Sequence, residues 1–214
     1  MKLLLYVIGC FFLLVPASSR PHSKHDLIDQ SYRVVLSEES KLSILGRTNV
    51  NHFQCKYTKP IEPEILQVNV CSASDGLHFS NAAIQLETIH FTGSPARMNQ
   101  ELHAFLKVKE HPTATIRLIK VDMSGDQMLN KAQQKALSLM DVTLAGVTKR
   151  YQIPITITHQ REEFSFSGLL NLNVCDFNLK PPVVMMGLIR VKKEVKVDFK
   201  INAYIEKVIM VKGN

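Results

Sequence analysis

The chain has 214 residues, 45% of them hydrophobic, and a formal net charge of +7. This predicts a targeting segment followed by one domain, or at most two small ones, with enough apolar residues for a sizeable core. Tryptophan is absent and aromatic residues make up only 7%, so a sugar-binding platform of stacked rings is not expected. The charge would suit an anionic lipid or nucleic acid. However, basic residues alternate with acidic ones, as in Lys192-Lys193-Glu194, which is typical of a solvated strand face.

Residues 1–19 have the pattern of a secretory signal peptide. Lys2 supplies the positive charge, residues 3–15 an apolar run, and residues 16–19 the small side chains of a cleavage site. The run is shorter than the roughly 20 apolar residues that a membrane-spanning helix needs. A second interpretation uses Val-Ile-Gly-Cys at residues 7–10, which resembles a lipobox that would place acyl chains on Cys10. We expect cleavage after Ser19 and a periplasmic or secreted protein, with the lipid-anchored form as the alternative.

Residues 20–33 are predicted to form a flexible arm in front of a domain that spans residues 34–214. This domain holds Cys55, Cys71 and Cys175, an odd number for an oxidising compartment. Cys55 and Cys71 flank a proline-rich turn at residues 59–63, so a hairpin disulfide between them fits the spacing. The alternative is that all three cysteines are small buried hydrophobic residues.

Alternating apolar and polar residues predict β-strands with one dry and one wet face. The clearest alternation covers residues 195–203, and similar patterns cover residues 66–70, 151–158 and 164–173. Further strands are expected at residues 41–47, 50–57, 77–87, 113–121 and 138–145. Closely spaced strands of this kind, joined by turns, favour an antiparallel sheet that forms a sandwich or closes into a barrel.

One helical segment interrupts the strands, at the start of the stretch MNQELHAFLKVKEHPTATIRL (residues 98–118). Leu102, Phe105 and Leu106 share one face, and Pro112 is expected to end the helix and begin the next strand. An amphipathic helix in an all-β domain needs a dry surface to cover, and we expect it at one mouth of a barrel. The polar residues 124–135 are interpreted as a surface excursion.

Five segments, in this order along the chain, resemble the YceI-like family of exported bacterial proteins. They are residues 46–57 (GRTNVNHFQCKY), the helix and strand of residues 98–118, residues 141–149 (DVTLAGVTK), residues 176–179 (DFNL) and residues 180–205. The resemblance covers roughly residues 34–205 and implies a lipocalin-like antiparallel barrel. It also implies an apolar tunnel for a polyisoprenoid or fatty-acyl chain, and a barrel of about 8 strands is wide enough to enclose such a ligand.

Three positions depart from the pattern of that family. Asn178 stands where the family has glycine, and asparagine also tolerates the positive φ of such a turn. A cysteine that related proteins carry near Thr92-Gly93, where it could pair with Cys55, is missing, which leaves Cys71 as the nearby candidate partner. The segment before Ser138 does not match, so access of a ligand near it is not implied.

The resemblance points to twelve inward apolar residues as the lining of the tunnel. They are Phe53, Leu66, Val68, Leu102, Phe105, Ile153, Ile155, Phe164, Phe166, Leu172, Val197 and Phe199. Periodicity alone is equally compatible with a solid core, because both arrangements need the same inward-facing side chains. The protein would then be a structural or interaction protein of the cell envelope.

The sequence contains no clear pattern for catalysis, a metal or a cofactor. The eight histidines are scattered, apart from His22 and His25 in the predicted arm, and lack cysteine or histidine companions at metal-site spacing. A GxSxG elbow is absent, and the aromatic residues share the dry parity instead of interleaving with lysine as for nucleic acid. We expect a protein that binds a long-chain lipid and is not an enzyme, with membrane contact and a dimer left open. Hydrolysis by two carboxylates is the third alternative.

Overall fold

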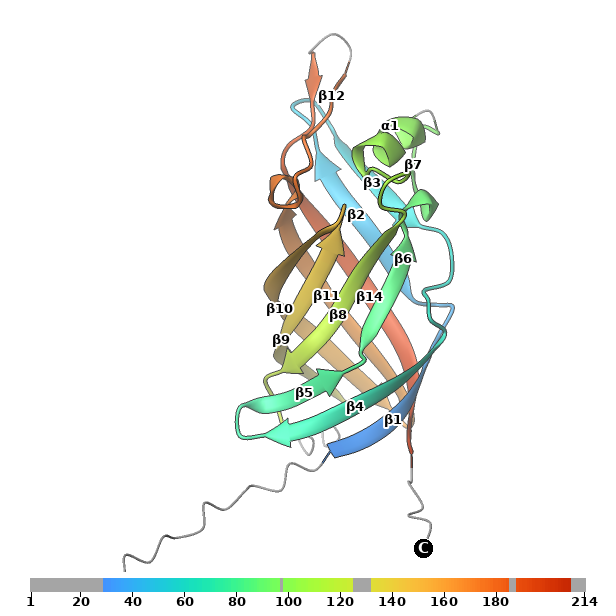
Figure 1. Cartoon of the computed structure of the whole chain (residues 1–214), viewed down its shortest axis with the longest axis vertical. Coiled ribbons are helices and arrows are strands. Elements are labelled where there is room, and N and C mark those ends of the chain that lie inside the picture. Colours follow the sequence, from blue (N-terminus) through green and yellow to red (C-terminus); the bar gives the residue numbers. More distant parts are fainter. Residues whose placement is uncertain (1–28, 97, 125–131, 185–187, 209–214) are drawn as a thin grey trace, which may run out of the picture.

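Eight strands pair side by side in a closed antiparallel ring, which forms the long body of the molecule (Figure 1). The ring closes because β1 pairs with β4 on one side and with β14 on the other. In order around the ring, the strands are β1 (Asp29–Leu36), β4 (Ile65–Ala73), β5 (Gly76–Ser80), β8 (Thr113–Val121), β9 (Gln133–Leu144), β10 (Val147–Gln160), β11 (Glu163–Asn173) and β14 (Glu194–Lys207). The computed structural model describes residues 29–96, 98–124, 132–184 and 188–208. The predicted all-β antiparallel barrel is confirmed.

The two ends of the ring have different walls because two long strands change neighbours along their length. β14 pairs with β1 through residues 203–207 and with β2 (Lys41–Arg47) through residues 196–200. β3 (His52–Tyr57) and β7 (Phe91–Gly93) continue the sheet from β2. β8 pairs with β5 near its end and with β6 (Ala83–Glu87) at its start. Figure 1 shows β1, β4 and β5 at the lower end, and β3 and β7 at the upper end.

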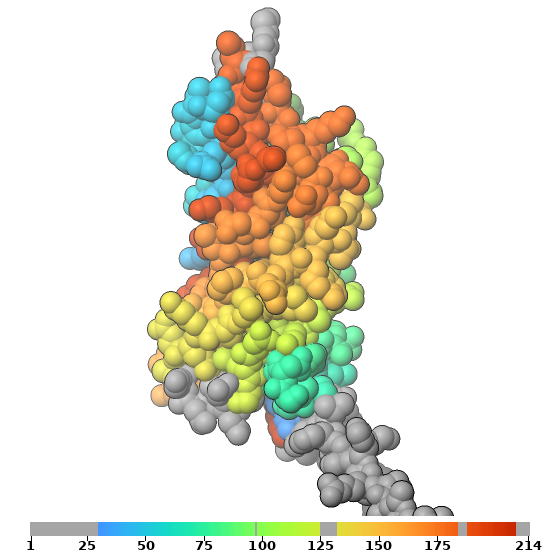
Figure 2. Space-filling model, turned by 90° about the vertical axis from the view of Figure 1, so that its left-hand side faces the viewer, coloured from blue at the N-terminus to red at the C-terminus, as the bar shows by residue number. Residues whose placement is uncertain are grey.

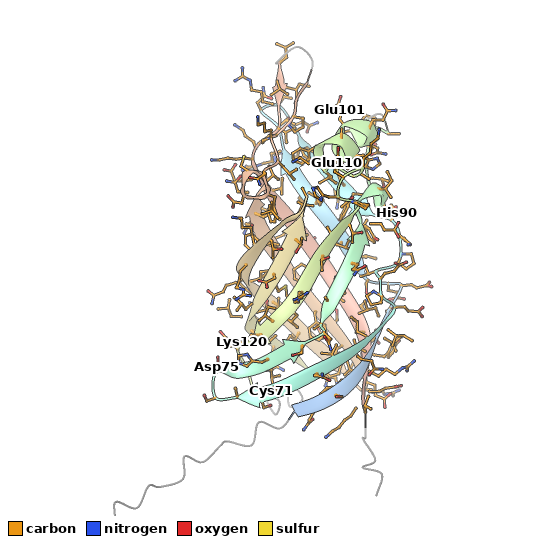
Figure 3. The ribbon with its side chains drawn as sticks, viewed as in Figure 1. Cys71, Asp75, His90, Glu101, Glu110 and Lys120 are labelled. Carbon is orange, nitrogen blue, oxygen red and sulfur yellow. The ribbon has the colours of Figure 1, made fainter. Side chains whose placement is uncertain are left out.

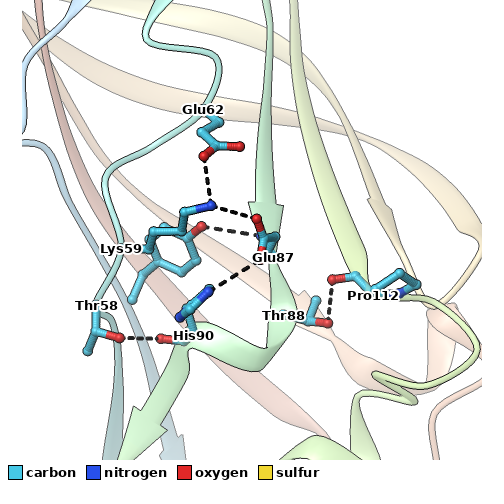
Figure 4. A network of polar contacts seen from close by, with 8 residues as sticks. Thr58, Lys59, Glu62, Glu87, Thr88, His90 and Pro112 are labelled. Atoms are coloured by element: carbon cyan, nitrogen blue, oxygen red, sulfur yellow. Dashed lines mark hydrogen bonds and ion pairs between the residues drawn. The ribbon is translucent and has the colours of Figure 1, made fainter.

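A polar network spans the seam of the upper wall between β6 and the segment that runs on from β3 (Figure 4). An isolated bridge between Glu62 and Gln85 joins this segment to β6. Lys59 Nζ lies 2.7 Å from Glu62 Oε1 and 2.6 Å from Glu87 Oε1. His90 Nε2 lies 3.3 Å from Glu87 Oε2, and the Tyr57 hydroxyl accepts the backbone N–H of Glu87. The Lys59 ammonium holds the pKa of the Glu87 carboxyl below its ordinary value. The network therefore joins side chains where strand pairing is almost absent.

Residues with positive φ make the sharp turns of the barrel. Ala145 (φ 48°) and Gly146 (φ 78°) connect β9 to β10, and the positive φ at both positions is that of a type I′ hairpin turn. Asn178 has φ 56° and follows the 3₁₀ helix η2 (Val174–Phe177) in the left-handed region. The expectation that asparagine preserves this turn is therefore confirmed.

The helix predicted from its amphipathic pattern is present as α1 (Met98–Phe105), at the upper end of the barrel (Figure 1). The Asn99 side chain accepts the N–H of Gly93 at 2.8 Å, and His103 Nε2 donates to the Phe91 carbonyl at 3.1 Å. Both contacts tie α1 to β7. The helix ends at Phe105, before Pro112, but β8 begins directly after that proline as predicted.

Three predicted boundaries are wrong. Residues 29–33 belong to β1, because all of them pair with β4 and residues 32 and 33 also pair with β14, so the flexible arm cannot extend to residue 33. Residues 133–135 belong to β9, where they pair with residues 156–158 of β10, rather than to a surface excursion. The predicted strand 77–87 is split into β5 and β6 at Asn81, which has φ 63°. The predicted signal peptide and residues 20–28 lie outside the described residues.

Side chains fill the lower half of the ring. Ile155, Ile157, Phe164 and Ala203 are at most 5% exposed there, and the rings of Phe164 and Phe166 stack at 6.2 Å. No helix in the described ranges is long and apolar enough to cross a bilayer.

Candidate functional site

The upper half of the barrel contains an apolar cavity of about 660 Å³. Leu42 and Ile44 of β2, Val195 and Val197 of β14, and Leu172 of β11 form part of its wall. Leu102 and Phe105 of α1 face the same space, so the helix covers a dry cavity at one mouth, as the sequence predicted. Its volume lies within the range of pockets that bind small molecules, about 300–1,000 Å³.

The structure places five of the twelve predicted lining residues at the cavity: Phe53, Leu102, Phe105, Leu172 and Val197. The other seven are not among the residues that line this cavity. They pack into the hydrophobic core below: Leu66, Val68, Ile153, Ile155, Phe164, Phe166 and Phe199. The reason is that each long strand runs through both halves of the barrel. Some of its inward-facing side chains therefore face the cavity, and others pack in the filled half.

Several lining residues were missed by the sequence interpretation. They come mainly from the short upper strands and from β8 and β9: Leu86, Phe91, Met98, Leu106, Ala114, Ile116, Val142 and Leu144. Their apolar alternation was visible, since residues 113–121 and 138–145 were expected to be strands. The sequence also indicated that Ala114 lies near the mouth of the barrel, because its strand follows directly on the helix that is predicted to cover this mouth.

A close contact between β2 and β3 shapes the mouth of the cavity. Phe53 lies opposite Gly46 in the strand register. The ring of Phe53 takes the room that a side chain at position 46 would need, with Cε2 and Cε1 only 2.6 and 2.7 Å from an added Cβ. Glycine at position 46 therefore leaves room for the end of the Phe53 ring against β2.

Polar residues also border the cavity, which keeps its apolar interior in contact with a hydrophilic rim. They are Thr48, Asn51, His52, Ser94, Glu101 and Lys192. Glu101 lies on α1 at the upper end (Figure 3), and Lys192 is exposed. A ligand with an apolar chain and a polar head group could contact both parts.

Cys55 and Cys71 are free thiols, and the predicted hairpin disulfide between them does not form. Cys55 on β3 pairs with Gly93 of β7, whereas Cys71 on β4 pairs with Asp29 of β1 and His78 of β5. Figure 3 shows Cys71 at the lower end. The two segments do not form a hairpin because each strand turns to a different neighbour.

The Cys55 thiol borders the cavity and is buried. Burial raises its pKa to about 11, because the thiolate would lose its hydration in this apolar wall. The thiol therefore stays neutral at pH 7 and acts as a small apolar surface, not as a nucleophile.

Histidine, cysteine, aspartate and glutamate side chains do not gather in any group of three or more that could hold a metal ion, within the part of the chain that the structure describes. The arrangement offers a partly open apolar space with a polar rim. An apolar cavity of this size inside a barrel has room for a small apolar ligand.

The chain belongs to the YceI-like domain family, whose pattern it matches over residues 38–203. Among solved structures, it is similar to a polyisoprenoid binding domain from Saccharophagus degradans implicated in plant cell wall breakdown. The TM-score is 0.59 at 12% identity, and the match covers 83% of this chain and 99% of that one. Burkholderia cenocepacia BcnA is also similar, with a TM-score of 0.58, 16% identity and coverage of 76% and 95%. At these identities the likeness shows a common fold. No curated protein matches the chain significantly.

Proposed function

We propose that this protein is exported and binds one isoprenoid or fatty-acyl chain in the upper half of its barrel, without transforming it. The observation that carries the proposal is the apolar cavity of about 660 Å³ beneath α1. Membership of the YceI-like family and the fold shared with a polyisoprenoid binding domain support the same ligand class.

The cavity volume favours a chain of moderate length. A methylene group takes about as much room as a water molecule, roughly 30 Å³ in the liquid. The 660 Å³ of the cavity therefore correspond to a chain on the order of 20 carbon atoms. A longer chain would leave its remainder outside the mouth, because the core closes the lower half.

Apolar burial would supply most of the affinity, at about 25 cal/mol per Å² of surface removed from water. The polar groups at the rim would stay with the head group of the lipid. The neutral Cys55 thiol fits this role, since a lining without charge adds no desolvation cost for an apolar chain.

The test is lipid extraction and mass spectrometry on the protein exported through its own N-terminal segment and purified without detergent. We expect a stoichiometric fatty-acyl or isoprenoid compound from the wild type. Val197→Trp should lose it, because a large ring at this lining position fills the cavity. Lys196→Trp, one residue away on the exposed face of β14, is the matched control and should keep it.

Thermal unfolding of both variants separates loss of binding from loss of fold. If the wild type releases no lipid and binds no added fatty acid or isoprenoid, the proposal is wrong. The remaining explanation would be a structural or interaction protein of the envelope.

A further inference from the structure

Two loops that are distant in the sequence form one surface at the upper end of the barrel. The Asn49 amide donates to the Leu188 carbonyl at 2.9 Å and accepts the N–H of Arg190 at 2.8 Å. The N–H of Lys192 donates to the Arg47 carbonyl at 2.8 Å. Figure 2 shows the blue β2–β3 segment beside the orange-red segment around β12 (Val183–Val184) and β13 (Ile189–Arg190).

We call this surface the basic tip and define it by six exposed residues: Arg47, Val50, Val183, Leu188, Lys192 and Lys193. Its apolar members are unusual. Leu188, Val50 and Val183 are 71, 68 and 58% exposed, which makes them the three most exposed large apolar side chains among the described residues. Side chains of this kind in one patch indicate a surface that is covered by something else.

The charge of the two loops identifies what covers the tip. Residues 47–53 and 180–193 contain five basic residues (Arg47, Lys180, Arg190, Lys192 and Lys193) and no carboxylate, in a chain whose formal net charge is +7. Glu194, the next acidic residue, lies 3.8 Å from Lys193 Nζ. Loops that carry both exposed apolar residues and basic residues suit the interface of an anionic bilayer, by insertion and by about 1 kcal/mol per Lys or Arg near the surface.

The basic tip is continuous with the mouth of the cavity. Val50 and Lys192 border the cavity as well as the tip, and Ile189 and Val191 line the cavity from the same loop. A tip seated on a bilayer would therefore place the mouth next to the acyl chains. An apolar ligand would then pass between bilayer and barrel without crossing water.

We propose that the basic tip docks the protein on the surface of an anionic lipid bilayer. The docking itself does not require the cargo, since it uses exposed side chains, and four of the six tip residues lie outside the cavity wall. Tip variants are for this reason confined to Arg47, Lys193, Val183 and Leu188, none of which lines the cavity.

The experiment measures binding of the purified protein to phosphatidylcholine vesicles with and without phosphatidylglycerol, at low and high salt. We expect binding only with phosphatidylglycerol, weakened by salt. The double variant Arg47→Glu/Lys193→Glu should lose more than tenfold in affinity, and Val183→Ser/Leu188→Ser should also bind more weakly. Lys196→Glu/Lys200→Glu, on the outer face of β14, is the matched control for the charge reversal. Ile65→Ser/Ile89→Ser is the matched control for the loss of exposed apolar side chains.

Equal losses in tip and control variants would overturn the proposal, as would binding that ignores phosphatidylglycerol. The proposal would also be overturned if the protein does not bind the vesicles and sedimentation shows a dimer that forms through the tip. Lipid extraction on the same variants separates this proposal from the proposed function, because vesicle docking without cargo, or cargo without docking, each contradicts only one of the two.

Discussion

The end of the Phe53 ring lies against Gly46 across the β2–β3 pair, in the room that any larger residue at position 46 would occupy. Because Phe53 also lines the cavity, this pair couples the packing of the wall to the space for a ligand. An aromatic ring that covers a cross-strand glycine is a recognised way to stabilise a curved sheet.

Gly46→Ala should push the Phe53 ring away from β2 and into the cavity. We expect a stability loss of about 1–3 kcal/mol, typical of overpacking, and weaker binding of a fluorescent fatty acid. Chemical unfolding and a binding titration measure the two effects.

The Phe53→Ala background is the control, because without the ring the methyl group has nothing to displace. The stability cost of Gly46→Ala should shrink there, as a double-mutant cycle would show. An unchanged cost would mean that the ring is not the obstacle.

Phe199 is expected to limit the chain length that the cavity accepts. It follows Val197 on the inner face of β14 and pairs with Leu42, and both neighbours line the cavity, whereas Phe199 does not. Phe199→Ala should extend the cavity downwards, shift the preferred fatty acid to a longer chain, and cost about 3–5 kcal/mol of stability. Competition among fatty acids of increasing length measures the shift.

Phe164→Ala is the matched control for this prediction. Phe164 is equally buried but pairs with Ala203 in the filled lower half. A similar stability loss with an unchanged chain preference is expected there. A shift of the same size in both variants would show that general loosening, not the position of Phe199, sets the length.

Gly93→Cys should introduce a disulfide with Cys55. The two residues are cross-strand partners, and a Cβ added at Gly93 would stand 3.2 Å from Cys55 Sγ. Only the flexible end of Met98, which lies 2.5 Å from that point, has to move. We expect a stabilisation of about 2–4 kcal/mol under oxidising conditions, and two free thiols, Cys71 and Cys175, instead of three in residues 29–208.

Thiol titration and non-reducing unfolding measure these changes. Thr92→Cys, whose partner is the exposed Lys56, should leave Cys55 free. Retention of the Cys55 thiol in the Gly93→Cys protein would contradict the register of β3 and β7.

Glu87→Gln should weaken the seam between β3 and β6 in a pH-dependent way. Lys59 lowers the pKa of Glu87 in the folded state, so this carboxylate adds stability above its unfolded pKa. That contribution is lost as the pH falls through the lower folded pKa. The melting temperature of Glu87→Gln should therefore lie below that of the wild type at pH 7 and converge with it in strongly acidic solution.

Asp198→Asn is the control, since Asp198 is exposed on β14 and belongs to another part of the wall. If the melting temperature of Glu87→Gln differs from that of the wild type by the same amount at all pH values, the ion pairs do not stabilise the seam.

The sequence by itself determined the fold class and the position of the helix. Alternation over residues 195–203 identified the inner face of β14, because a strand sends successive side chains to opposite sides. The break at Pro112 placed the start of β8, because proline fixes its own backbone angle and disfavours helix before it. These signals are local, so they can be interpreted without knowing which strand is the partner.

Only the tertiary structure decided which inward residues face a cavity and which fill a core. Val197 and Phe199 have the same parity on one strand, yet only Val197 lines the cavity. Both residues also pair with β2, so neither their parity nor their neighbouring strand distinguishes them. The meeting of Arg47 with Lys192 was equally hidden, since the backbone hydrogen bond between them joins residues far apart in the chain. Periodicity records the side of a strand that a residue takes, whereas a cavity depends on what the opposite wall contributes.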